Sequence, residues 1–123
     1  MSILKVFNTH LVEFLDDFQS VINSSELKTA ILFINTTKKI NPSMFIKGWD
    51  TYINIPYKSK IESGDFTFFL EKNYSNDVED DNKILDIINT IRYELKNLDE
   101  KDKKKVIKYV QNLTKICEMY KNK

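Results

Sequence analysis

The chain is poor in the residues that make tight turns, with two glycines and two prolines among 123 residues. β-Sandwiches and barrels need many such turns, so this scarcity argues against both. No apolar run approaches the ~20 residues that cross a membrane. Glu13, Asp16 and Asp17 interrupt the first apolar stretch, so the N-terminus does not resemble a signal peptide. We therefore expect an intracellular protein that is neither secreted nor membrane-spanning.

Cysteine, histidine and arginine each occur once. The single Cys117 excludes an intramolecular disulfide framework, and its place in an apolar stripe predicts a packed, inert thiol. Arg92 is the only arginine, which disfavours sequence-specific DNA readout because arginine is the usual bidentate reader of guanine. His10 flanks an apolar stripe with Glu13 one turn on, and we interpret it as a residue at the core boundary. We find no catalytic, metal or phosphate motif, so we expect no enzymatic activity and no cofactor.

Three stretches carry apolar residues at alternating spacings of three and four, the period at which one helix face packs along another. Such spacing predicts a helical bundle. The three stripes are Leu4, Phe7, Leu11, Phe14, Phe18 and Val21; Ile84, Ile88, Ile91, Leu95 and Leu98; and Val106, Val110, Leu113, Cys117 and Tyr120.

The expected fold is an all-α single domain, 1–123, of five to six helices with a long N-terminal helix. Asn23, Ser24 and Ser25 offer caps for a second helix, and Asn23 with Glu26 has the residue types of a capping box. We expect this helix to be buried on most sides. Pro56 should end a third helix and Gly64 should close a short turn. The last two helices, almost without a linker, should form an antiparallel hairpin whose stripes pack together. The expected helices are 3–22, 27–40, 42–53, a short one bearing Phe66, Phe69 and Leu70, 83–98 and 100–120.

An acidic, polar loop is expected at about 75–82, with Asp77, Glu79, Asp80 and Asp81. A calcium loop of the EF-hand type counted from Asp77 would need glycine at position six and glutamate at position twelve, where this chain has Asn82 and Ile88. We interpret the stretch as a solvated loop whose carboxylates favour the dipole of the following helix, with weak divalent-ion binding as the alternative.

A lysine run opens the last expected helix. From residue 101 to the end there are eight lysines against Asp102 and Glu118, a local charge of +6 in a chain whose formal net charge is +1. Such a run is either a solvated outer face or a surface for polyanions. The candidate nucleic-acid-binding residues are Lys101, Lys103, Lys104, Lys105 and Lys108.

Aromatic residues concentrate in the middle of the chain. Short helices cannot bury every ring, and exposed Trp and Tyr are typical anchors of protein interfaces. In the alternative interpretation, Phe45, Trp49 and Phe69 cap one end of the bundle core. The candidate partner-binding residues are Trp49, Tyr52, Tyr57 and Phe68.

The chain also contains a series of short aromatic motifs. They are Phe7, Phe14 and Phe18; Asn41-Pro42; Pro56-Tyr57; Ile61; Asp65; Phe68-Phe69-Leu70; Tyr74; and Ile107, Tyr109, Val110, Leu113 and Tyr120. Over nearly the whole length they resemble a family of small uncharacterised helical proteins from large DNA viruses of algae and protists. Members often carry Trp where this chain has Tyr93 and Lys108. The resemblance implies a viral origin and a place in the infected cell or the virion, and it implies no activity.

Together these features predict a non-enzymatic, virus-encoded module that binds a viral or host protein through its aromatic middle segment. The alternative is a virion or genome-associated protein that binds nucleic acid phosphates non-specifically through the lysine-rich C-terminal helix. The partner's identity and the oligomeric state do not follow from the sequence.

Overall fold

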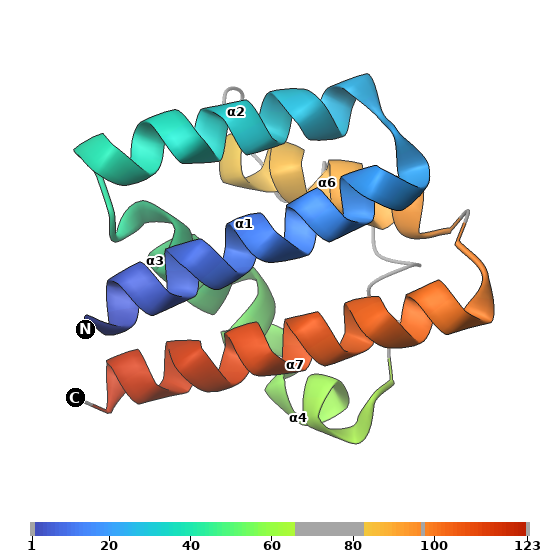
Figure 1. The fold of residues 1–123 in the computed structure, drawn as a ribbon. Helices are drawn as coiled ribbons and strands as arrows, with labels where there is room; N and C mark the ends of the chain where they lie inside the picture. Colours follow the sequence, from blue (N-terminus) through green and yellow to red (C-terminus); the bar gives the residue numbers. More distant parts are fainter. Residues whose placement is uncertain (1, 66–82, 97, 123) are drawn as a thin grey trace.

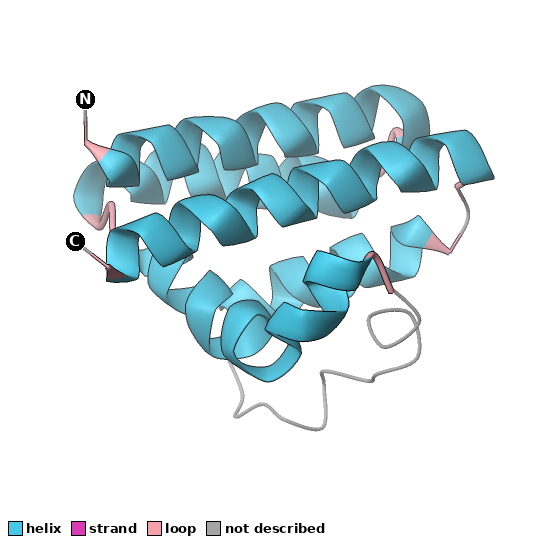
Figure 2. Ribbon diagram, turned by 90° about the horizontal axis from the view of Figure 1, so that it is seen from below, coloured by secondary structure: helices cyan, strands magenta, loops and turns pink. Residues whose placement is uncertain are grey.

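The computed structural model describes residues 2–65, 83–96 and 98–122. Within these ranges every regular element is a helix and none is a strand (Figures 1 and 2), which confirms the all-α prediction. None of these helices is long and apolar enough to span a bilayer. The expected short helix with Phe66, Phe69 and Leu70 and the acidic loop at 75–82 lie outside the described residues.

The first helix, α1 (Ile3–Ile22), has the predicted bounds. The Ser2 side chain caps its start by accepting a hydrogen bond from the backbone N–H of Lys5 at 3.1 Å. Asn23 ends it in the left-handed conformation, with φ 54°, which asparagine tolerates better than most residues. Every apolar residue of the predicted stripe from Phe7 to Phe18 is buried.

The second helix, α2 (Ser25–Ile40), corrects two predictions. Its N-cap is Ser24, one of the three residues that the sequence offered, whose hydroxyl accepts from the N–H of Leu27 at 3.2 Å. The capping-box role of Asn23 is wrong. Asn23 is instead used to close α1, and one residue cannot adopt both backbone conformations. The helix is also buried on one side only, because Leu32 and Ile40 are 68% and 81% exposed.

The middle of the chain consists of three consecutive helical elements: α3 (Met44–Trp49), a π-helical turn η1 (Asp50–Asn54) and α4 (Ile55–Ser63). The backbone therefore stays helical across Pro56. The prediction that Pro56 ends a helix is therefore wrong. Proline lies in the first turn of α4, where a missing N–H costs little, and the wide π-turn precedes it. The change of direction falls one residue later, at Tyr57, with φ −132° and ψ 15°. Gly64 closes α4 at φ 81°, as predicted.

The last two helices are α6 (Lys83–Leu95) and α7 (Glu100–Lys121). The predicted packing of their stripes against each other is not confirmed. The most extensive helix pairing in the described residues joins α7 to α1, while α6 packs on α2. In Figure 1, α1 lies between α2 and α7, and it runs antiparallel to α7. A stripe of apolar residues specifies a face to bury but not the helix that covers it.

One hydrophobic cluster joins every described helix. Phe7, Leu27, Phe45, Ile61, Ile88 and Leu113 all belong to it and are at most 5% exposed. A partly buried hydrogen bond also joins α1 to the turn between α2 and α3, because Asn8 Nδ2 donates to the carbonyl oxygen of Pro42 at 2.9 Å. The cluster therefore gives α1 and α7 a common core with the middle helices.

Leu113 on α7 is fully buried, so its truncation to alanine tests the α1–α7 core. We expect Leu113→Ala to lower the free energy of unfolding by about 2–5 kcal/mol, the usual range for a buried leucine. Met119, on the same helix and 60% exposed, offers the matched control, and Met119→Ala should change stability by less than about 0.5 kcal/mol. Urea denaturation followed by circular dichroism measures both; equal effects would remove Leu113 from the core.

Candidate functional site

Helix α7 begins with its own local signals. The Asp99 side chain accepts from the N–H of Asp102 at 2.8 Å, and Glu100 and Asp102 lie in the first turn, where carboxylates favour the helix dipole. The apolar residues Val106, Val110, Leu113 and Cys117 are all buried. Because these residues fix which side faces inward, the remaining side chains of α7 are oriented by the helical period.

Four of the five predicted lysines form a continuous surface, which we call the lysine face: Lys101, Lys104, Lys105 and Lys108. They follow one another at spacings of one and three residues, within about 100° of the helix circumference, and all are exposed. Lys103 is different, because it points to another side and its Nζ lies 3.7 Å from Glu100 Oε1. The structure thus brings four of the predicted residues together and separates the fifth.

No residue in the described part of the chain forms an ion pair with the lysine face. Other lysines are engaged: Lys58 pairs with Glu118, and Lys121 Nζ lies 3.1 Å from Asp50 Oδ1. The four like charges lie on adjacent turns and repel one another. Asp17 and Asp102 line a hollow together with Lys105 but form no ion pair with it. The surface is therefore suited to anions from outside the described chain.

The aromatic candidates do not form one exposed patch. Trp49 is only 8% exposed; its ring packs edge-on against Phe7 with centroids 6.0 Å apart. Its indole Nε1–H donates to the Thr114 hydroxyl at 3.1 Å, across to α7. Of the two interpretations of Trp49, the structure agrees with the core position and contradicts the exposed anchor, because the ring is buried between α1 and α7. Tyr52 and Tyr57 are half-buried against the core, and Phe68 lies outside the described residues.

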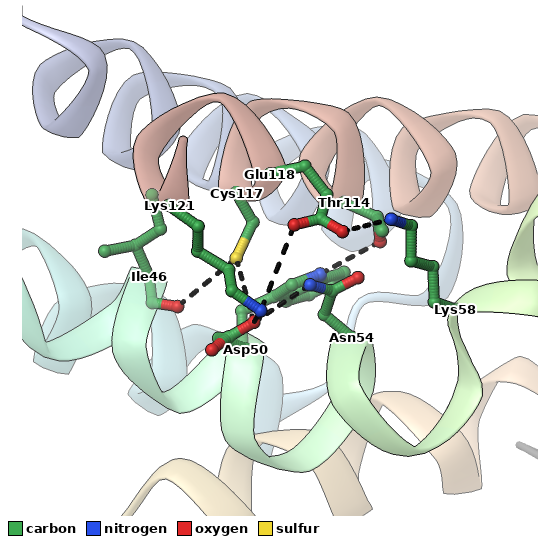
Figure 3. Close-up of polar contacts among 9 residues, drawn as sticks. Ile46, Asp50, Asn54, Lys58, Thr114, Cys117, Glu118 and Lys121 are labelled. Atoms are coloured by element: carbon green, nitrogen blue, oxygen red, sulfur yellow. Dashed lines mark hydrogen bonds and ion pairs between the residues drawn. The ribbon is translucent and has the colours of Figure 1, made fainter. Parts of the chain in front are cut away.

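A polar cluster joins the π-turn to the end of α7 (Figure 3). Asn54 Nδ2 donates a hydrogen bond to Asp50 Oδ1 at 2.9 Å. Lys121 Nζ forms an ion pair with the same oxygen. A hydrogen bond from Lys58 lowers the pKa of the Glu118 carboxyl, and the same contact raises the pKa of Lys58. The bond with Asp50 raises the pKa of Lys121. The charged groups of the cluster pair with one another, so we interpret the cluster as a structural contact that holds η1, α4 and α7 together.

Cys117 lies beneath this cluster. Its thiol is 3.8 Å from the Ile46 carbonyl oxygen and 3.8 Å from Asp50 Oδ1. Burial, followed by the negative charge of Asp50, raises the pKa of the Cys117 thiol to about 12. A thiol held protonated in this way is a poor nucleophile, in agreement with the prediction from its apolar stripe.

His10 lies where α1 meets α7. Its Nδ1 is 3.6 Å from Glu13 Oε2 and its ring centroid is 5.2 Å from that of Tyr109, as expected for a residue at the core boundary. Tyr109 donates its hydroxyl to Asp17, which together with burial raises the pKa of Tyr109 to about 12. No local pattern predicts the Asp17–Tyr109 contact, since the two residues are 92 positions apart.

The structure offers no metal site in the ranges that it describes, where no three His, Cys, Asp or Glu side chains come together. The acidic residues from Asp77 to Asp81 are outside those ranges, so divalent-ion binding there stays a prediction.

No protein-family model, curated protein or solved structure matches this chain. The resemblance to proteins of large DNA viruses therefore stays a prediction. The lysine face is the candidate functional site, on its geometry alone.

The Trp49–Thr114 hydrogen bond yields a stability test. Thr114→Val keeps the volume but leaves the buried indole N–H unpaired, which we expect to cost about 1–3 kcal/mol. In a Trp49→Phe background, where no indole N–H remains, the same threonine substitution should cost much less. Chemical denaturation of the four proteins measures the coupling. Equal costs in the two backgrounds would show that the bond contributes nothing.

The Cys117 thiol predicts how stability changes with pH. Its pKa rises from an ordinary 9.0 to about 12 on folding, so above pH 9 the unfolded chain loses a proton that the folded chain keeps. Stability should fall by about 1 kcal/mol between pH 8 and pH 10 from this group. Urea melts of the wild type and of Cys117→Ala across this range measure the difference. If the free energies of unfolding of the two proteins fall equally with pH, folding does not raise the pKa of the thiol.

Proposed function

We propose that this protein binds the phosphate groups of nucleic acid through the lysine face of α7. The observation that carries the proposal is the alignment of Lys101, Lys104, Lys105 and Lys108, all exposed, on one side of a single helix. The local excess of positive charge from residue 101 onwards supports it. An α-helix presenting cations along one side follows a polyanion without any requirement for a cleft.

The chemistry of lysine determines the kind of binding. Each ammonium group is a point charge without the planar fork of arginine, so it attracts phosphate but reads no base. The interaction should tolerate any sequence and fall in the non-specific range of about 10⁻⁴–10⁻⁶ M. The resemblance to proteins of large DNA viruses would make the bound polymer a viral genome, in the infected cell or in the particle.

Binding to another protein through the middle segment is the second candidate. With Trp49 buried, the partner surface would consist of Tyr52, Tyr57 and Phe68. Ile55 favours this candidate, because it is three residues from Tyr52 and 65% exposed. The lysine face has the stronger support, since its four side chains are exposed together, whereas the two tyrosines pack partly against the core.

The salt dependence of DNA binding tests the first candidate. Binding through about four lysines predicts a slope of log K against log salt near −3.6 on duplex DNA. Replacing Lys101, Lys104, Lys105 and Lys108 with Gln should abolish binding and leave the helical circular dichroism unchanged.

The control variant carries the same change of charge elsewhere, at four exposed lysines of α1, α2 and α3: Lys5, Lys28, Lys39 and Lys47. Measured by fluorescence anisotropy, it should retain a slope near −3.6 on a labelled duplex and about −2.8 on a labelled single strand. No binding by the wild type at low salt ends the proposal. An equal loss in both variants would show that net charge, and not the lysine face, is responsible.

A further inference from the structure

A second surface lies on the other side of α1, where α2 and α6 pack together (Figure 1). Between them is a groove of about 280 Å³. Its apolar floor consists of Ala30, Phe33 and Ile87, and Thr29 and Thr90 line its walls. No residue of the lysine face lines the groove, so a role of the groove is independent of the function proposed above.

The floor of the groove is anchored from below. Phe33 packs edge-on against the buried Phe45 of α3, with ring centroids 6.0 Å apart, and Ala30 is 7% exposed. Phe33 and Ile87 are only half-buried, although both border the core cluster. The floor is therefore preformed and still has apolar surface left to cover, as in typical binding grooves.

One further apolar side chain is exposed beyond the groove on each helix. Ile40, seven residues after Phe33 and so on the same side of α2, is 81% exposed. On α6, Tyr93 is seven residues after Asp86 and is 68% exposed. From Glu26 to Ile40 the α2 side of this surface is about 21 Å long, which corresponds to about four turns of an added helix.

The described side chains of the groove carry charge of one sign. Glu26 and Asp86 line it, and no cation is among the lining residues that the structure describes. Hydrogen bonds from its own backbone N–H, Ser24 and Ser25 lower the pKa of Glu26, so its carboxylate stays ionised. A partner that covers the apolar floor must therefore bring positive charges to the rim.

We propose that the α2–α6 groove binds an amphipathic helix of a partner protein, one that carries apolar residues at alternating spacings of three and four, flanked by lysine or arginine. The groove between two packed helices accepts a third helix, whose side chains interdigitate with theirs. A strand would need an unpaired sheet edge, and the described residues contain none. The two carboxylates select a basic helix over an acidic one.

Two labelled helical peptides of about five turns test the proposal. Both carry the same leucine stripe; one has lysine and the other glutamate at the flanking positions. We expect fluorescence anisotropy to show that the lysine peptide binds and that the glutamate peptide binds at least about tenfold more weakly. Asp86→Lys should narrow or reverse this preference, whereas Asp16→Lys, an equal change of charge at an exposed site on α1, should preserve it.

A steric variant separates the groove from diffuse charge attraction. Thr29→Arg places a long side chain in the groove and should reduce binding of the lysine peptide by at least about tenfold. Thr9→Arg, at an exposed threonine of α1, should leave it unchanged. Circular dichroism melts establish that all variants are folded.

Three outcomes would overturn the proposal: no binding of the lysine peptide, equal binding of both peptides, or equal effects of Thr29→Arg and Thr9→Arg. A concentration-dependent dimer that Thr29→Arg abolishes would also overturn it, because a second copy of the chain would then occupy the groove. None of these results depends on whether the protein binds DNA through the lysine face.

Discussion

The packing of α1 against α7 is the contact on which the rest of the structure depends. It joins the first and last described helices, about 90 positions apart in the chain, so its formation carries the entropic cost of closing a long loop. Phe7, Phe14 and Leu15 on one side and Val110 and Leu113 on the other are almost completely buried. The middle helices then attach to this pair through Trp49, whose ring touches Phe7 and whose N–H reaches Thr114.

The packing of α1 against α7 also determines which side chains of α7 are exposed. With Val106, Val110 and Leu113 turned inward, the helical period turns Lys101, Lys104, Lys105 and Lys108 outward. The polar cluster of Asp50, Glu118 and Lys121 at the far end of α7 is paired internally. Charge at one end of α7 thus holds the fold, while the lysine face at the other end has no ion-pair partner among the described residues.

Spacing in the sequence predicts which side of each helix is buried, but not what covers it. The stripe from Phe7 to Phe18 and the bounds of α1 follow directly from local pattern and capping, and the structure has both. The partner of α7 could not be predicted in this way, because the stripes of α1 and α6 have the same period. Pro56 was misleading for a related reason: proline breaks a helix interior but is compatible with a first turn.

The candidate site was predictable to the extent that it is local. The lysine run is visible in the sequence, and only the inward direction of α7 was needed to separate Lys103 from the other four. The buried position of Trp49 involves a hydrogen bond to Thr114, which is 65 positions away, so no local pattern predicts it. The α2–α6 groove likewise arises from two segments about 60 residues apart in the chain.

The antiparallel arrangement of α1 and α7 has a mechanical consequence. The start of α1 and the end of α7 lie at the same end of the molecule (Figure 1). Tension applied across the two ends of the chain would therefore peel the helices apart turn by turn, and only a few of the small individual contacts would resist at any moment. A molecule pulled in this geometry yields at low force, even where its core is well packed.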